Sequence, residues 1–237
     1  MAPIVERQLQ LPGSGILYDA SRLRKPAQEV FTREYWASRG SHVEVAGGRA
    51  SVSFIRTEEA NWVLRHYRRG GLIAKLFDDQ YLWLGASRTR SFTEWRLLAE
   101  LYKRELPVPA PVAARYVRSG LVYRADLITE ELPPSKTLAN LMAELDPQAW
   151  QAVGKTVARF HAQGVYHADL NAHNILLGES GVVYVLDFDR GRIRARGAWE
   201  EQVLARLKRS LEKIARQRAE ARFSNREWDW LMEGYAG

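Results

Sequence analysis

The sequence predicts an α+β fold, with an antiparallel sheet in the first part of the chain and a mainly helical second part. Two observations lead to this prediction. Strand-like segments follow one another within the first 130 residues, and segments of helical periodicity dominate the second half. Strands that precede helices are typical of α+β folds rather than of doubly wound sheets. A length of 237 residues suits one domain of two lobes or two small domains, and a composition of 46% hydrophobic and 27% charged residues is that of an ordinary globular protein.

The first predicted elements form a hairpin and a third strand. Residues 41–56 alternate polar and apolar side chains on both sides of a turn that contains Gly47 and Gly48, which is a hairpin pattern. Residues 61–67, "NWVLRHY", have the composition of the next strand. Together these segments begin the predicted sheet.

A helix and a further strand complete the first lobe. Residues 89–106 carry apolar side chains three and four positions apart, so we expect an amphipathic helix. The proline-rich residues 107–117 must be extended, because proline biases its neighbours away from helix. Residues 121–129 read as a strand, and "EELPPS" follows as a proline-interrupted connection. We place the lobe boundary there, giving an N-terminal lobe of 1–130 and a C-terminal lobe of 131–237.

The second lobe is predicted to begin with a well-delimited helix. Asp146 can cap its start, Pro147 suits its first turn and Gly164 can end it. The elements predicted after it are strands at 174–177 and 182–188, joined through "GESG", and a long helix at about 199–222 with one apolar stripe.

Four polar residues stand at the ends of these apolar strands. His167, Asp169 and Asn174 form H-x-D-L-x-x-x-N, and Asp187 lies thirteen residues beyond Asn174 in the run D-F-D. Phosphoryl transfer needs Mg²⁺ bound by hard oxygen ligands, which a carboxylate and an amide oxygen supply. It also needs a separate carboxylate to orient the acceptor hydroxyl and receive its proton. Groups of these types suit that chemistry, with Asn174 and Asp187 as the oxygen ligands of the metal and Asp169 as the separate carboxylate.

This pattern resembles the catalytic loop and metal-binding turn of the protein-kinase-like superfamily. The resemblance implies a two-lobed protein-kinase-like fold, ATP and Mg²⁺ as cofactors, and a structural role for His167. It also implies an ATP site in the first lobe, with a cation that holds the phosphates and pairs with a carboxylate. The residues assigned to that site are Gly47 and Gly48 in the covering hairpin, Arg65 or alternatively Lys75 as the cation, Glu94 as its partner, and Thr129 and Glu131 near the adenine.

Several departures argue against a protein kinase. Ala168 replaces the arginine of the kinase loop, Asp189 makes the turn D-F-D, and no A-P-E segment follows. The segments "WVLRHYRRGGLIAKL", "YLWLGASRTRSFTEWRLL", "LPVPAPVAARYVR", "YRADLIT", "VYHADLNAHNILL" and "VLDFDRG" are instead similar to the bacterial lipopolysaccharide kinases, specifically the 3-deoxy-D-manno-octulosonic acid (Kdo) kinase family. They cover most of residues 60–191.

This resemblance implies transfer of the ATP γ-phosphate to a hydroxyl of Kdo on a lipid A precursor, with the 4-hydroxyl expected. It also implies a peripheral location on the cytoplasmic face of the bacterial inner membrane. The charge distribution agrees independently. The net charge is +7, and residues 190–222 hold eleven Lys or Arg against four Glu. Such a surface attracts an anionic glycolipid and an anionic membrane. Aromatic residues that can anchor at headgroup level are Trp83, Trp199, Trp228, Trp230 and Tyr235.

Other function classes explain less of the sequence. A heptose kinase of the same pathway or a kinase for a soluble small-molecule alcohol would share the Asp–Asn–Asp core, although the basic surroundings favour an anionic acceptor. A pseudokinase-type binding module would not need all three residues. Nucleic-acid binding accounts for the pI of about 9.7 but not for the motif, so no nucleic acid is expected. The sequence has no cysteine, no apolar run long enough for a membrane span and no recognisable export signal.

Overall fold

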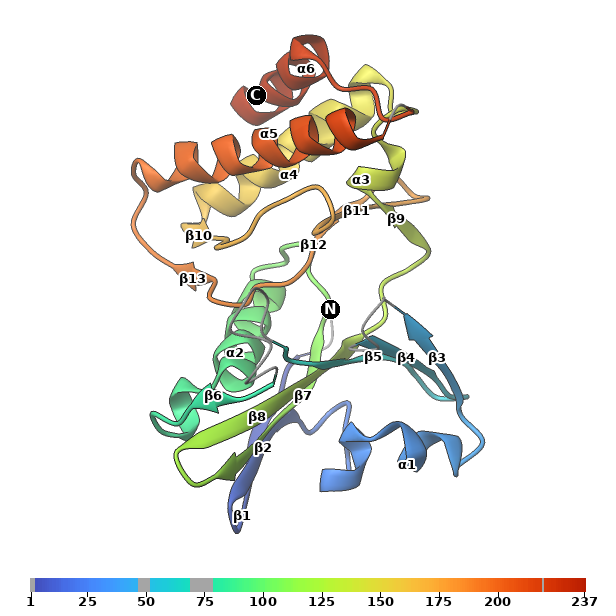
Figure 1. Cartoon of the computed structure of the whole chain (residues 1–237), viewed down its shortest axis with the longest axis vertical. Coiled ribbons are helices and arrows are strands. Elements are labelled where there is room, and N and C mark those ends of the chain that lie inside the picture. Colours follow the sequence, from blue (N-terminus) through green and yellow to red (C-terminus); the bar gives the residue numbers. More distant parts are fainter. Residues whose placement is uncertain (1–2, 47–51, 69–78, 219) are drawn as a thin grey trace. The chain divides into compact units, whose positions relative to one another are not determined.

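The computed structural model describes residues 3–46, 52–68, 79–218 and 220–237. The chain divides into two compact units (Figure 1). The first consists of Met1–Lys103 and Pro109–Glu131, and the second of Arg104–Val108 and Leu132–Gly237. The main division therefore falls after Glu131, one residue beyond the boundary expected from the sequence.

In the residues that the structure describes, the first unit is built on one antiparallel sheet of eight strands. Along the sheet the order is β1 (Glu6–Leu11), β2 (Ser14–Asp19), β7 (Pro111–Ser119), β8 (Val122–Glu130), β5 (Asn61–His66), β4 (Val52–Arg56) and β3 (His42–Ala46), with β6 (Tyr81–Leu82) also pairing β8. This arrangement confirms the predicted hairpin of β3 and β4 and the third strand β5. The β1–β2 hairpin was not predicted.

Helix α2 (Arg90–Lys103) packs on β7 and β8 and has a buried face of Phe92, Trp95, Leu98 and Leu101 (Figure 1). These positions are three and four apart, so the predicted amphipathic helix is confirmed. The 3-10 turn Gln28–Phe31 and the short helix α1 (Arg33–Ala37) contribute to an apolar cluster that also contains residues of β2, β4, β5, β7 and β8. The sheet is therefore held by packing as well as by its hydrogen-bond ladders.

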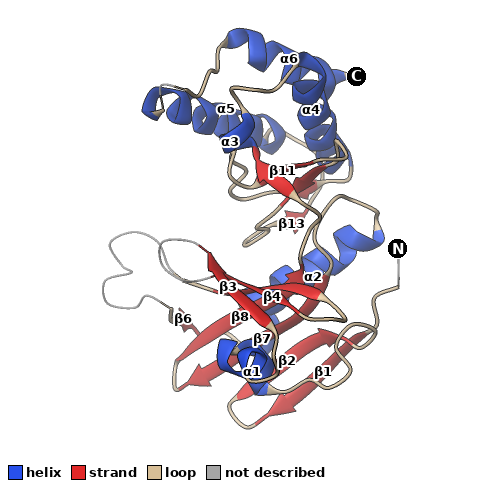
Figure 2. Cartoon of the chain, turned by 90° about the vertical axis from the view of Figure 1, so that its right-hand side faces the viewer, coloured by secondary structure: helices blue, strands red, loops and turns tan. Residues whose placement is uncertain are grey.

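The second unit is mainly helical (Figure 2). Its helices are α3 (Leu138–Leu141), α4 (Pro147–Ala162), α5 (Trp199–Gln217) and α6 (Asn225–Ala236). Its strands form two small antiparallel sheets, β9 (Ser135–Thr137) with β11 (Ile175–Gly178) and β12 (Val183–Val185), and β10 (Val165–Tyr166) with β13 (Arg192–Ile193). The described part of the chain contains no helix long and apolar enough to cross a membrane.

Local signals set the start of α4 and α6. The Asp146 side chain accepts a hydrogen bond from the Ala149 N–H at 2.8 Å, and Pro147 occupies the first turn, as predicted. Ser224 and Glu227 form a capping box at the start of α6. Sequence reasoning missed α6, although this Ser-x-x-Glu pattern was the signal that could have revealed it.

The predicted extent of the long helix was wrong at its C-terminal end. Helix α5 ends at Gln217 rather than near residue 222, and Arg218 is extended with φ −127° and ψ 114°. The buried stripe of α5 ends at Ile214. The positions three and four residues beyond Ile214 are Gln217 and Arg218, which are both exposed, so packing does not stabilise another turn there.

Candidate active site

The catalytic loop, residues 167–174, is carried between two strands of the second unit. Strand β10 leads into it and β11 leaves it. The chain then returns through the β11–β12 hairpin, and the Leu186 N–H donates to the Asn174 carbonyl at 2.9 Å. This hydrogen bond brings Asp187, the next residue, beside the end of the loop. The strand pairing thus gathers Asp169, Asn174 and Asp187 into one region of the second unit.

His167 holds the backbone of this region together. The side chain is buried, and its Nε2 donates to the Leu186 carbonyl at 2.8 Å. Its Nδ1 accepts from the Asp169 N–H at 3.1 Å, which leaves the ring neutral with the proton on Nε2. Burial lowers the pKa of His167 and favours this neutral form. The predicted structural role of His167 is therefore confirmed.

Asp169 and Asn174 are positioned by shared backbone contacts. The Asn174 side-chain NH₂ donates to the Asp169 carbonyl at 3.0 Å, so the amide oxygen of Asn174 is directed elsewhere. The Asn171 side chain donates to the same carbonyl at 3.0 Å. Asp169 itself is exposed. The backbone of Asp169 is thus held at its amide and its carbonyl. Its exposed carboxylate can accept a hydrogen bond from a hydroxyl group that arrives from solution.

Asp187 has an unusual backbone conformation. Its φ is +61°, in the left-handed region that non-glycine residues seldom occupy. The next residue, Phe188, is buried against the rings of His167 and Phe160, at centroid distances of 4.8 and 5.7 Å. This anchor holds the strained residue in place. Backbone strain of this kind is concentrated at functional sites, where packing compensates for it.

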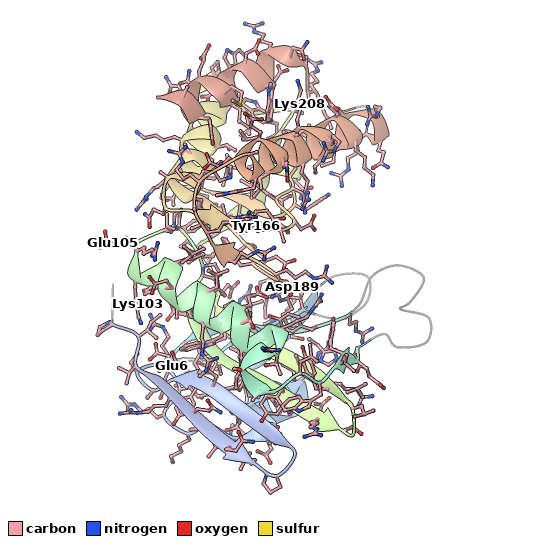
Figure 3. The ribbon with its side chains drawn as sticks, turned by 90° about the vertical axis from the view of Figure 1, so that its left-hand side faces the viewer. Glu6, Lys103, Glu105, Tyr166, Asp189 and Lys208 are labelled. Carbon is pink, nitrogen blue, oxygen red and sulfur yellow. The ribbon has the colours of Figure 1, made fainter. Side chains whose placement is uncertain are left out.

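The second unit therefore offers a carboxylate and an amide oxygen that fit a magnesium ion. Mg²⁺ is typically held by one or two protein oxygens together with phosphate oxygens and water. Asp187 and Asn174 are of this type and are joined through the Leu186–Asn174 hydrogen bond. Asp189, labelled in Figure 3, follows two residues later and is half-buried. Its role stays a prediction.

The predicted ion pair of the first unit is present. Arg65 of β5 donates from a terminal guanidinium nitrogen to the Glu94 carboxylate of α2 at 2.5 Å. Glu94 is only 2% exposed, so it is not an ordinary surface charge of the helix. Lys75, the alternative cation, lies outside the described residues. The choice between Arg65 and Lys75 for the phosphates therefore stays a prediction.

Tyr67 is a third member of this group and was not predicted. Its hydroxyl donates to the same Glu94 oxygen at 2.5 Å, and its ring centroid lies 4.8 Å from the Arg65 guanidinium carbon. Arg65 and Tyr67 are two positions apart, so their side chains leave the extended chain on one side. That spacing was the available signal. The tyrosine fixes the orientation of both charged groups.

The residues predicted near the adenine lie at the end of β8. Thr129 pairs with Val63 of β5 and with Pro111 of β7. The Glu131 N–H donates to the Asn61 carbonyl at 2.9 Å, and its carboxylate pairs with Arg56 at 2.9 Å. The Glu131 N–H is thus used by the sheet, and the adenine roles of Thr129 and Glu131 stay predictions. Gly47 and Gly48 lie outside the described residues.

Comparison with known proteins identifies the family. Residues 33–235 match the family model described as lipopolysaccharide kinase (Kdo/WaaP) family. The chain is 46% identical over 206 residues to a protein of Xylella fastidiosa strain 9a5c named 3-deoxy-D-manno-octulosonic acid kinase, covering 86% of this chain and 82% of the relative. Proteins of the same name from Stenotrophomonas maltophilia strain R551-3 and Xanthomonas campestris pv. campestris strain B100 are 47% and 48% identical, over 86% and 84% of this chain and 82% and 80% of the relatives.

A solved structure, that of the Cydia pomonella granulovirus kinase PK-1, is similar with a TM-score of 0.45 and 13% identity, over 70% of this chain and 58% of that one. The family assignment rests on the sequence matches, which span most of the chain. The matched range, residues 33–235, includes the segments that carry Asp169, Asn174 and Asp187. The chain belongs to the lipopolysaccharide kinase (Kdo/WaaP) family and is an enzyme of the kinase class.

Proposed function

We propose that this kinase transfers the γ-phosphate of ATP to a hydroxyl of the Kdo sugar, the 4-hydroxyl, on a lipid A precursor in lipopolysaccharide core biosynthesis. The observation that carries the proposal is the gathering of Asp169, Asn174 and Asp187 by the hydrogen bonds of His167 and Leu186. The names of the relatives supply the acceptor: they are Kdo kinases at 46–48% identity.

Each residue has one task in the proposed reaction. Asp169 accepts a hydrogen bond from the acceptor hydroxyl, orients it and takes its proton as the bond to phosphorus forms. Asn174 and Asp187 would hold magnesium, which would neutralise phosphate charge. The Arg65 guanidinium, fixed by Glu94 and Tyr67, binds phosphate oxygens of the nucleotide. His167 keeps the loop in position and takes no proton from substrate.

We further propose that the enzyme works as a peripheral protein on the cytoplasmic face of the inner membrane. A patch of apolar side chains on the first unit supports this, and we call it the leucine patch. Leu82, Leu84 and Leu121 are 61%, 61% and 77% exposed. They are neighbours, because Leu82 pairs with Val122 and the Trp83 N–H donates to the Leu121 carbonyl at 2.9 Å. Clustered exposed leucines mark an interaction surface rather than ordinary surface composition.

Cationic side chains border the leucine patch. The Arg118 guanidinium carbon lies 5.1 Å from the centroid of the Trp83 ring, and Arg88 is exposed on the 3-10 turn that follows Leu84. Arg124 is also nearby but pairs with Asp79 at 2.6 Å. Exposed leucines beside arginines suit a bilayer with anionic headgroups, since the apolar groups insert and the charges stay at the surface.

The proposed activity is tested by incubating the purified chain with labelled ATP, Mg²⁺ and a Kdo-bearing lipid A precursor, and by locating the new phosphate by mass spectrometry. We expect one phosphate on the Kdo 4-hydroxyl and none with Asp169→Ala. If the phosphate is found instead on a heptose, or on a soluble alcohol offered in competition, the proposed Kdo acceptor is wrong. ATP binding without transfer to any acceptor would identify a pseudokinase-type module.

A further inference from the structure

We propose that Arg192 and Arg194 form an oxyanion-binding subsite that holds a phosphate group of the lipid acceptor while its sugar hydroxyl meets Asp169. The inference rests on the proposed function and assigns the part of the acceptor that these two residues contact. Both are exposed and lie in the second unit, in the segment that follows Asp187.

The backbone that carries these arginines is tied to the strand that enters the catalytic loop. In the β10–β13 pair, Arg192 lies opposite Tyr166, and the Arg194 N–H donates to the Gly164 carbonyl at 2.9 Å. Gly164 has φ +72°, and a Cβ there would lie 2.4 Å from the Arg194 carbonyl oxygen. The two segments therefore approach as closely as their backbones allow. The backbone of Arg192 and Arg194 is therefore held in place by its pairing with residues 164–166.

This pairing limits the separation between the arginines and the catalytic carboxylate. Opposite Cα atoms of an antiparallel pair are about 5 Å apart. The three residues from Tyr166 to Asp169 span about 11 Å at most. The Cα atoms of Arg192 and Asp169 thus lie within about 16 Å, by the same extended-chain limits. An acceptor headgroup of several sugars can span this interval, so one molecule can present a hydroxyl at one end and a phosphate at the other.

Both guanidinium groups are oriented by one aromatic ring. The guanidinium carbons of Arg192 and Arg194 each lie 5.4 Å from the centroid of the Tyr166 ring. Arg194 also lies 5.8 Å from the Trp199 ring. Figure 3 labels Tyr166 on the strand beside α5. Stacking on a ring restricts the long side chains before any ligand arrives, which reduces the ordering cost of binding.

Carboxylates do not balance the positive charges of Arg192 and Arg194. Within the described ranges, neither Arg192 nor Arg194 makes an ion pair, whereas Arg196 binds Glu200 with two hydrogen bonds of 2.8 and 2.9 Å. Two guanidinium groups gathered over one ring repel each other until an anion joins them. A phosphate monoester matches them because each guanidinium fork can donate two hydrogen bonds to its oxygens.

Helix α5 places one further cation near the catalytic loop. Burial is the main cause of the lowered pKa of His167; Arg206 of α5 also lowers it, whereas Asp187 and Asp169 raise it more strongly. The Ser210 hydroxyl, one turn further along α5, accepts a hydrogen bond from the Ala172 N–H of the loop at 3.2 Å. The two aspartates therefore outweigh Arg206 at the loop, and the attraction of the acceptor phosphate is assigned to Arg192 and Arg194.

The test uses the full chain and compares the double variant R192Q/R194Q with wild type. In neutral detergent micelles, with Kdo-bearing lipid A precursor that has both lipid A phosphates, we expect KM for the acceptor to rise roughly 10- to 100-fold. KM for ATP and kcat should change less than about twofold, since neither residue meets the nucleotide. R192K/R194K should recover only part of the loss, because lysine keeps the charge without the fork.

Two controls separate the subsite from general charge. K213Q/R216Q removes two exposed cations from the far end of α5 and should leave KM for the acceptor within about twofold, as expected for surface charges outside a contact. An acceptor stripped of its lipid A phosphates should bind wild type more weakly and should no longer distinguish it from R192Q/R194Q. A loss that persists with the stripped acceptor would overturn the phosphate assignment, and so would equal losses in both double variants.

The subsite and the proposed activity can fail separately. If wild type transfers no phosphate to Kdo, the proposed function is wrong, and the subsite is then tested by binding alone. Micelles of bisphosphorylated lipid A without Kdo should bind wild type roughly tenfold more tightly than they bind R192Q/R194Q, and dephosphorylated micelles should bind both alike. Equal binding of bisphosphorylated micelles to the two proteins would overturn the proposal. Mixing anionic phospholipid into the micelles shows whether lipid headgroups compete for the same pair.

Discussion

At the residue scale, the two aspartates of the motif differ in what surrounds them. Asp169 is exposed and its backbone is held at both the amide and the carbonyl. Asp187 is half-buried, with φ +61°, beside the buried Phe188. In the proposed reaction, Asp169 meets the incoming acceptor and Asp187 holds a ligand in a fixed geometry. Substitutions at the two positions should therefore impair different properties of the enzyme, namely turnover and Mg·ATP binding.

Substitution of Asp169 by alanine should lower kcat roughly 10³-fold while leaving the Kd of Mg·ATP within about threefold, because the carboxylate acts on the acceptor hydroxyl. Steady-state kinetics and nucleotide titration measure the two effects. Retained wild-type turnover would remove Asp169 from the mechanism. Loss of ATP affinity equal to the loss of kcat would mean that it binds nucleotide instead.

Substitution of Asp187 by asparagine should weaken Mg·ATP binding roughly tenfold or more in addition to lowering kcat, since a neutral oxygen replaces an anionic ligand. The affinity for ATP without Mg²⁺ should change little. Isothermal titration with and without Mg²⁺ separates these cases. Equal changes under both conditions would show that Asp187 does not act through the metal.

Loss of the Glu94 carboxylate should affect both stability and nucleotide binding. Glu94→Gln keeps an acceptor oxygen but removes the buried negative charge that Arg65 and Tyr67 share, and we expect the free energy of unfolding to fall by about 1–3 kcal/mol. KM for ATP should rise, while Tyr67→Phe, which keeps the ion pair, should have a smaller effect on both. Urea unfolding and kinetics provide the measurements. If Glu94→Gln has the stability and the KM for ATP of the wild type, the Arg65–Glu94 ion pair contributes to neither.

At the scale of elements, α4 and α6 are joined through two glycines. A Cβ at Gly154 of α4 would lie 1.8 Å from the Leu231 carbonyl oxygen, and one at Gly234 of α6 would lie 2.0 Å from the Gln151 carbonyl oxygen. These neighbours are backbone atoms, so no side-chain rotation relieves the clash. Close backbone approach explains why two residues with poor helix propensity stand within helices.

Gly154→Ala should destabilise the protein by about 1–3 kcal/mol, even though alanine is the better helix former by about 1 kcal/mol. The reason is that the two helices must separate to accommodate the methyl group. Lys155→Ala, at the next and exposed position, should change stability by less than about 0.5 kcal/mol. Urea unfolding measures both. Equal or greater stability of Gly154→Ala would show that the helices do not pack as described.

A buried histidine at the same helix pair predicts a pH dependence of stability. His161 Nδ1 lies 2.8 Å from the Tyr235 hydroxyl, and burial lowers the pKa of His161 to about 4, with Glu200 and Arg196 exerting smaller, opposed effects. In the unfolded chain the histidine titrates near 6.5. Between these values the unfolded state binds more protons, so stability falls as the pH decreases from about 6.5 to 4.

Replacing His161 by glutamine should remove up to about 3 kcal/mol of this dependence between pH 7 and pH 4. His167 also has a lowered pKa because it is buried, so some slope should remain in the variant. Unfolding by urea at several pH values measures the slopes. Parallel wild-type and variant curves would show that His161 is protonated equally in both states.

At the scale of the whole molecule, the leucine patch and the basic residues of the segment 190–222 should each contribute to membrane binding. Flotation with vesicles containing anionic lipid should recover the protein at low salt, and recovery should fall as salt screens the charges. L82S/L121S should lower binding roughly tenfold or more, because each buried leucine contributes about 1.5–3 kcal/mol. Val182→Ser, at an exposed apolar position of the second unit, should have little effect. If the wild type, L82S/L121S and Val182→Ser are recovered equally with the vesicles, the leucine patch does not contribute to membrane binding.

Much of the fold could be predicted because its elements carry local patterns. The helix α2 follows three- and four-residue apolar steps, and α4 starts at Asp146 and Pro147 as its caps require. The β1–β2 hairpin was missed because its outer strand is largely exposed and has no clear apolar face. The end of α5 was misplaced because alanine and charged residues beyond Ile214 are compatible with helix locally.

The sequence by itself determined the chemistry of the candidate site, because Asp169, Asn174 and Asp187 lie on one loop and hairpin whose spacing encodes their proximity. Only the tertiary structure decided which groups surround them. The Arg65–Glu94–Tyr67 contacts, the close approach of α4 and α6 at their glycines, and the two arginines over Tyr166 join residues that are far apart in the sequence, as with Gln151 and Gly234, or depend on ring orientation. Short-range periodicity in the sequence carries no information about such contacts, because they form only when folding brings distant residues together.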